Sequence, residues 1–175
     1  MALRLEDKKA LVAEVNDVAA TALSAVAAEY RGLDVAQMTE FRARAREAGV
    51  YVRVVKNTLA KRAVEGTEFE CLRDTLEGPL VLAFSREDPG AAARVIRDFA
   101  KENEALKTRV VAIGGAAYGP EDLERLASLP NLDQARAMLL GVLQAPFAAF
   151  VRTIAEPPAM LARVLAARED AASAD

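Results

Sequence analysis

The residues best suited to chemistry lie in one short stretch, residues 50–62. Four cations lie here with an amide and a hydroxyl side chain between them: Arg53, Lys56, Asn57, Thr58, Lys61 and Arg62. Cations neutralise phosphate, and amide and hydroxyl groups donate hydrogen bonds to its oxygens. We therefore expect these side chains to reach one surface that binds a polyanion.

The distribution of charge favours this prediction. The whole chain has a net charge of −3, yet residues 40–62 contain seven cations and only two carboxylates. A single basic cluster is usually just a solvated face. An acidic protein that collects its cations in one segment, however, directs its positive field to one place. Such a pattern indicates a local contact with nucleic acid.

The elements that must position these side chains can be predicted from periodicity and turn signals. Residues 50–55 are rich in Val and predict a strand, after which Asn57 is placed to cap a helix that begins at Thr58. A capping box at Thr67 and Glu70 predicts another short helix. The remaining signals predict helices at residues 5–22 and 34–48, from Pro89 and from Pro120, and strands at residues 23–28, 80–84 and 109–113.

Without the additional helices, the order of elements is β-α-β-β-α-β, which is the split arrangement of ferredoxin-like domains in the α/β (α+β) class. We expect an antiparallel sheet with its helices packed on one face. Gly114-Gly115 lacks the pattern of a phosphate loop and predicts a turn. The α/β domain should span residues 1–131, because Leu129-Pro130 closes the last short helix.

Residues 132–175 predict a long helical tail with an eleven-residue repeat of apolar positions, such as Leu139, Phe150 and Leu161. One alternative is an amphipathic helix folded back on its own domain. However, a helix of about 35 residues would reach about 50 Å, which exceeds the domain it would cover. An apolar repeat with no visible partner in its own chain indicates a partner supplied by another chain as the other alternative, and the residues alone leave both open. Three prolines should kink or break the helix: Pro146, Pro157 and Pro158.

Composition argues against an enzyme. Histidine is absent, and Cys71 is the single cysteine, expected to be a buried, inert thiol. We expect no cofactor and no metal. Charged residues make up 28% of the chain, the apolar runs look too short to span a membrane, and Arg4, Glu6 and Asp7 interrupt any signal peptide. These features predict a cytoplasmic protein.

Several short motifs, in their order and spacing, are similar to one family. They are Tyr30-Arg31-Gly32-Leu33, Met38-Thr39, Phe41-Arg42, Gly49, Val55-Lys56-Asn57-Thr58-Leu59, Leu76-Glu77-Gly78-Pro79, Gly114-Gly115 and Leu129-Pro130. Together they cover nearly the whole chain and resemble the bacterial large-subunit ribosomal protein L-ten family, the stalk-base proteins. The resemblance implies a structural ribosomal protein whose N-terminal domain binds 23S rRNA beside a neighbouring stalk-base protein. Members of the family also repress translation of their own messenger.

The resemblance also implies two sets of site residues. The RNA-binding set is Lys8, Lys9, Tyr30, Arg31, Gly32, Arg53, Lys56, Asn57, Thr58, Lys61 and Arg62. The stalk-protein-binding set, on the tail, is Leu139, Leu140, Leu143, Phe147, Phe150, Val151, Ile154, Leu161, Val164 and Leu165. The tail would carry dimers of the acidic stalk protein, which recruit translation GTPases. Three apolar units predict three dimers, with two as the alternative.

One rival hypothesis belongs to a different class of protein. A small soluble α/β enzyme or ligand-binding domain with a helical dimerisation tail would also fit the length and the order of elements. The missing histidine, the lone cysteine and the basic segment count against it.

Overall fold

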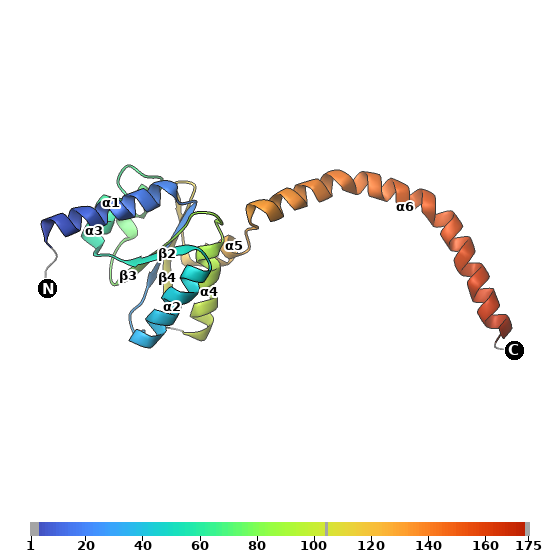
Figure 1. The fold of residues 1–175 in the computed structure, drawn as a ribbon, viewed down its shortest axis with the longest axis horizontal. Coiled ribbons are helices and arrows are strands. Elements are labelled where there is room, and N and C mark those ends of the chain that lie inside the picture. Colours follow the sequence, from blue (N-terminus) through green and yellow to red (C-terminus); the bar gives the residue numbers. More distant parts are fainter. Residues whose placement is uncertain (1–3, 104, 174–175) are drawn as a thin grey trace. The chain divides into compact units, whose positions relative to one another are not determined.

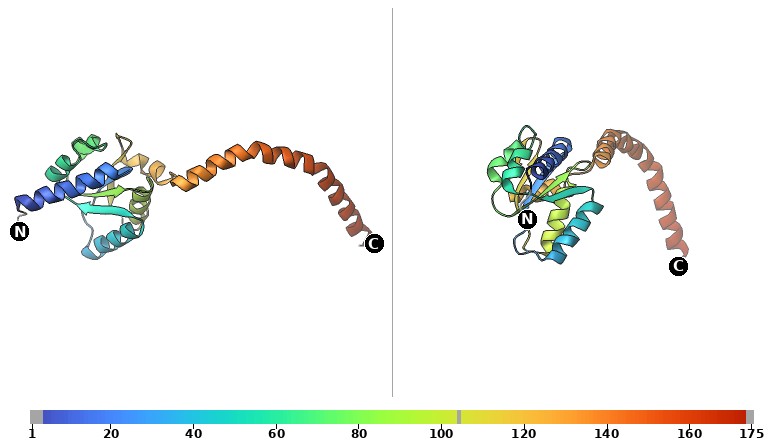
Figure 2. Two further views of the ribbon diagram at one scale, coloured as in Figure 1. Left: turned by 45° about the horizontal axis from the view of Figure 1, so that its top comes forward. Right: turned by 60° about the vertical axis from the view of Figure 1, so that its left-hand side comes forward.

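A computed structural model describes residues 4–103 and 105–173, with side chains described up to residue 168. The chain divides into two units, Met1–Asn131 and Leu132–Asp175. The first unit is a mixed α/β domain and the second contains one long helix (Figures 1 and 2). Each unit is described by itself below.

The α/β domain contains helices on either side of a sheet. Apart from one short additional strand, its elements follow one another along the chain in the order expected from the sequence. Its elements are α1 (Leu5–Thr21), β1 (Ser24–Glu29), α2 (Val35–Glu47), β2 (Val50–Val54), α3 (Asn57–Ala63), η1 (Glu70–Thr75), β3 (Leu80–Ser85), α4 (Ala91–Glu102), β4 (Lys107–Ile113), β5 (Ala116–Tyr118), η2 (Pro120–Asp122) and α5 (Leu123–Ala127). The two η elements are 3₁₀ turns.

The sheet confirms the ferredoxin-like prediction. Its strands lie in the order β2-β3-β1-β4-β5, and every neighbouring pair is antiparallel. The first four strands thus have the split β-α-β-β-α-β topology. Strand β5 was not predicted. It joins β4 through Gly114 and Gly115, whose positive φ angles of 56° and 81° suit a tight hairpin turn.

The two crossover helices of the ferredoxin-like arrangement, α2 and α4, pack on one face of the sheet as predicted, but the additional helices cover the other face, which was not predicted. Helices α1 and α3 and the η1 turn cover one face, where Phe69 and Phe84 meet with ring centroids 6.0 Å apart. Helices α2, α4 and α5 cover the other, where Phe41 and Phe99 lie 5.2 Å apart. Figure 2 shows helices on both sides of the strands. Strands β1 and β3 are buried on both faces, which explains why they are apolar at nearly every position.

Two predicted helix starts differ from the structure. Thr67 does not form a capping box, because its hydroxyl donates to the Val64 carbonyl and accepts from the Phe69 N–H, and a 3₁₀ turn follows. Asp88 does not cap a helix with Pro89 in its first position. Instead, the Asp88 carboxylate accepts the Gly90 N–H at 2.9 Å, and α4 begins at Ala91.

The second unit is α6, one helix of 42 residues from Leu132 to Ser173 that runs through Pro146, Pro157 and Pro158. The expected break at the prolines is therefore absent, and the helix curves instead (Figure 1). Part of α6, Leu132–Arg168, is also long and apolar enough to cross a membrane by length and composition alone. The sequence prediction that no such stretch exists was wrong, since it counted only uninterrupted apolar runs.

Candidate nucleic-acid interface and docking helix

A cleft of about 360 Å³ lies where β1 and β2 end and β3 begins. Four residues of the predicted RNA-binding set line it, namely Tyr30, Lys56, Asn57 and Thr58. The loop Gly78-Pro79 forms the opposite wall, and the Tyr30 N–H donates to the Pro79 carbonyl at 3.3 Å. Folding thus brings the Tyr30 turn and the Lys56 segment together, although 26 positions separate them in the sequence.

Asn57 has a different role from the one predicted. Lys56 is the N-cap residue of α3, and Asn57 is the first helical residue. The Asn57 side-chain amide donates to the Gly78 carbonyl at 2.8 Å, so it joins the two walls of the cleft. No local sequence pattern could have indicated this bond, because the partners are 21 residues apart.

The cleft presents groups that suit an RNA strand. Lys56 and Thr58 are exposed, and Tyr30 is a half-buried aromatic ring at the cleft wall. A lysine neutralises phosphate, a hydroxyl donates to its oxygens, and an aromatic face can stack on an unpaired base. Arg31 and Gly32 follow at the same turn and are exposed, and Gly32 has a φ of +96°, a conformation that favours glycine.

Arg53 does not line this cleft. It lies on the edge strand β2, and its guanidinium is 3.5 Å from the Glu14 carboxylate of α1. The Tyr51 hydroxyl donates to the same carboxylate at 2.6 Å. Burial, and then this hydrogen bond, raise the pKa of Tyr51 to about 12. Arg53 therefore has an acidic partner of its own, which an anion would have to replace.

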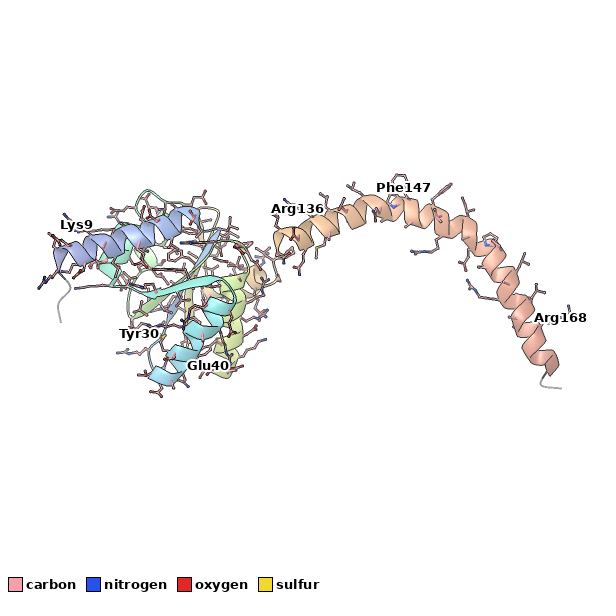
Figure 3. The ribbon with its side chains drawn as sticks, viewed as in Figure 1. Lys9, Tyr30, Glu40, Arg136, Phe147 and Arg168 are labelled. Atoms are coloured by element: carbon pink, nitrogen blue, oxygen red, sulfur yellow. The ribbon has the colours of Figure 1, made fainter. Side chains whose placement is uncertain are left out.

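The remaining predicted cations lie around α1 and α3. Lys8, Lys9 and Arg62 line a groove of about 400 Å³ between these helices, and Figure 3 labels Lys9 on α1. Lys61 is half-buried on α3. The cations predicted to share one surface are thus distributed over the cleft, the edge of β2, α3 and the groove.

Helix α6 exposes all ten residues of the predicted stalk-protein-binding set. Eleven residues correspond to about 1,100° of helical rotation, so each repeat returns to nearly the same side. Arg152 and Arg163 project from the other side, and Arg163 pairs with Glu156 at 2.8 Å. Figure 3 shows side chains such as Phe147 projecting from the helix. A continuous exposed apolar stripe of this kind indicates a surface for a partner.

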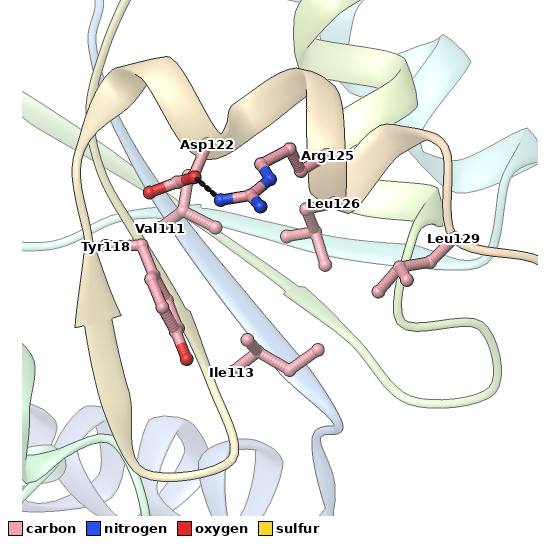
Figure 4. Close-up of a pocket in the computed structure, with 7 residues that line it drawn as sticks. All are labelled: Val111, Ile113, Tyr118, Asp122, Arg125, Leu126 and Leu129. Atoms are coloured by element: carbon pink, nitrogen blue, oxygen red, sulfur yellow. Dashed lines mark hydrogen bonds and ion pairs between the residues drawn. The ribbon is translucent and has the colours of Figure 1, made fainter.

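A third hollow lies outside both predicted sets of site residues. It has a volume of about 190 Å³ and lies between the β4–β5 hairpin and α5, with Val111, Ile113 and Tyr118 on one side (Figure 4). Leu126 and Leu129 lie on the other side, and an ion pair of 3.0 Å between Asp122 and Arg125 lies at its rim. No sequence pattern indicated this hollow, because strand β5, which contributes Tyr118 to its lining, was not predicted.

The structure offers little chemistry beyond binding. Cys71 is half-buried rather than fully buried, and desolvation raises the pKa of its thiol, which keeps it protonated and weakly nucleophilic. Over residues 4–103 and 105–173, no group of three or more acidic, cysteine or histidine side chains is placed to share a metal ion.

Comparisons with known proteins agree on one family. The family model described as ribosomal protein L10 matches residues 4–101, and that of the ribosomal protein uL10 C-terminal region matches residues 129–155. The chain is 60% identical to large ribosomal subunit protein uL10 of Alcanivorax borkumensis over 97% of each chain. It is 66% identical to the protein of the same name from Methylococcus capsulatus over 87% of each chain.

Proposed function

The chain belongs to the ribosomal protein L10 family, and on that premise we propose that its α/β domain binds 23S rRNA and that α6 anchors dimers of the acidic stalk protein. Each unit would have one binding function: residues 1–131 would bind RNA, and residues 132–175 would bind the stalk protein. The anchored dimers would then recruit the translation GTPases.

Membership of this family determines the general class of the protein, a structural protein rather than an enzyme. Proteins of this family are structural constituents of the large ribosomal subunit and not enzymes, which excludes the rival hypothesis of a small enzyme. The relatives indicate a location on the cytoplasmic ribosome of bacteria. The apolar character of α6 is then explained by contact with proteins rather than with lipid.

The cleft is the strongest support for the RNA proposal. It combines an exposed cation, a hydroxyl and an aromatic ring on walls held together by the Asn57–Gly78 hydrogen bond. Lys61 follows Asn57 by four residues and therefore lies on the same side of α3. Arg31, beside Tyr30, is exposed at the adjacent turn. We place the rRNA contact at this cleft, with Arg53 at its margin.

Salt-dependent RNA binding tests this placement. Each lysine that neutralises a phosphate contributes about 0.7–0.9 to the slope of log affinity against log salt concentration. The variants Lys56→Ala and Lys61→Ala should each reduce the slope by that amount on a 23S rRNA fragment. Lys101→Ala, an exposed lysine on α4, is the matched control. An unchanged slope in both the Lys56 and the Lys61 variant would contradict the placement.

The stalk proposal depends on the exposed stripe of α6. Each eleven-residue unit offers three or four large apolar side chains, and burial of each contributes roughly 1.5–3 kcal/mol before the costs of association. Two helices from a dimer could enclose one unit in a small bundle. Three units therefore imply three dimers.

Truncation of the tail tests this stoichiometry. A chain that ends at Glu156 keeps the first two units and loses Leu161, Val164 and Leu165. Native mass spectrometry of the complex with stalk protein should show one dimer fewer than with the full chain. If the truncated chain retained every dimer, the repeat would be no more than a helical stripe.

A further inference from the structure

The groove between α1 and α3 differs in character from the cleft. Val12, Ala13 and Leu59 make its walls aliphatic, and Leu5, at its end, is 68% exposed. Three cations stand at the rim, Lys8, Lys9 and Arg62. Asp17 is the one carboxylate among the residues that line it. The groove is thus an apolar surface with a net positive border.

The two helices hold the groove in a defined shape. Helix α1 packs against α3 over the core that Val15 and Ala60 share. The Asn16 side-chain amide donates to the Ala63 carbonyl at the end of α3, at 2.7 Å. The surface is therefore preformed, so a partner would not have to order it on binding.

We propose that this groove docks an acidic amphipathic helix from a neighbouring protein of the large subunit, and that Lys8, Lys9 and Arg62 serve this contact rather than the RNA contact. The lining contains no aromatic ring on which a base could stack. A phosphate placed over Val12 and Leu59 would lose water without gaining a hydrogen bond. An apolar helix stripe would instead cover these side chains, and flanking carboxylates would meet the cations.

The walls of the groove also select the form of the partner. Both walls of the groove are helices, α1 and α3. An extended segment would find no strand edge here and would leave its own backbone unpaired. A helix satisfies its backbone internally. Since α3 has seven residues and a length of about 10 Å, the contact should cover about two turns of the partner.

Photo-crosslinking in the assembled subunit tests the proposal. A benzophenone side chain is placed at Ala13, which is exposed and lines the groove, in the full-length chain incorporated into large subunits. The same probe at Ala10, an exposed residue of α1 outside the groove lining, is the matched control. We expect Ala13 alone to give a protein adduct, and peptide mapping should find an apolar stripe flanked by Asp or Glu. Lys8→Glu with Lys9→Glu should lower its yield at least about tenfold, since repulsion replaces attraction.

Three results would overturn the proposal: an adduct with rRNA, an adduct with a second copy of this chain, or no adduct from Ala13 in subunits that contain the probe. A separate measurement tests the alternative that Lys8 and Lys9 contact the rRNA. Lys8→Ala with Lys9→Ala should leave the affinity and salt slope for the 23S rRNA fragment unchanged, and a loss there would return these lysines to the RNA contact. The groove proposal depends on membership of the family, but it does not depend on RNA binding at the cleft or on stalk binding by α6. The experiments can therefore refute any one of these three proposals without refuting the others.

Discussion

Replacing the three prolines of α6 by alanine should raise the helix content of the free protein. A proline inside a helix lacks the N–H that would bond to the carbonyl four residues earlier, and its ring crowds that carbonyl. The cost is about 3 kcal/mol for each proline relative to alanine. Pro146, Pro157 and Pro158 all lie inside α6. The continuous helix therefore carries a local cost of about 9 kcal/mol.

Contacts within the described part of α6 do little to offset this cost, because its large apolar side chains are exposed. The prolines divide the helix into segments of roughly 11–16 residues, and isolated helices of that length are marginal in water. In solution the free chain should therefore populate forms broken at the prolines. A partner that buries the stripe would stabilise the continuous helix and order it on binding.

Far-ultraviolet circular dichroism of the full chain provides the assay. The triple variant Pro146→Ala, Pro157→Ala and Pro158→Ala should show more helical signal than the wild type. Stalk protein should increase the helical signal of the wild type by more than it increases that of the variant. Equal helical signals from the two free proteins would refute the reasoning, because they would mean that the proline-containing helix is already continuous without a partner.

Two further predictions concern the α/β domain. Gly90→Ala should lower the free energy of unfolding by about 1–3 kcal/mol in urea titrations, because its Cβ would lie 3.0 Å from the Leu126 carbonyl oxygen. Gly141→Ala, whose Cβ meets nothing within 4 Å, should not lower it. The raised pKa of Tyr51, about 12 against 10.0, adds stability below pH 10 that is lost as pH rises from about 10 to 12. Tyr51→Phe should therefore lose less stability than the wild type between pH 9 and 11 in the same titrations, and an equal loss would contradict the raised pKa of Tyr51.

Much of the fold could be predicted from local patterns. Gly49, with a φ of +68°, ends α2 where the sequence placed its end, and the order of strands follows from the order of elements. The two-sided packing was missed for a physical reason. Alternation between apolar and polar residues reveals which face of a strand is buried, but β1 and β3 are apolar at nearly every position and show no alternation. Their continuous apolar runs were themselves the signal of burial on both faces.

The candidate site was harder to predict, because its arrangement depends on contacts between distant residues. The Asn57–Gly78 bond joins α3 to a loop 21 residues away, and Glu14 on α1 binds both Tyr51 and Arg53 on β2. Propensity and spacing carry no information about such pairs. The groove between α1 and α3 was likewise hidden, since α1 looked only like a helix with a basic start.

The folded structure also changes what the charge count of the basic segment implies. Of the seven cations in residues 40–62, Arg44 bonds to Glu102 at 2.7 Å and to Glu40 at 2.5 Å, and Arg53 pairs with Glu14. Arg42 and Arg46 lie on α2, which covers the face of the sheet opposite to α3. The segment is continuous in sequence, but its cations lie on different surfaces of the domain.

The salt dependence of RNA binding should reflect this separation. If only Arg31, Lys56 and Lys61 reach phosphates at the cleft, the log–log slope of affinity against salt should be about −2 to −3, at 0.7–0.9 per contact. Seven contacts would give a slope of about −5 to −6. Titration of the wild-type protein with a 23S rRNA fragment over a range of salt concentrations distinguishes the two. A slope near the larger value would mean that α2 and the edge of β2 also face the RNA, and that the sheet does not separate the cations into independent surfaces.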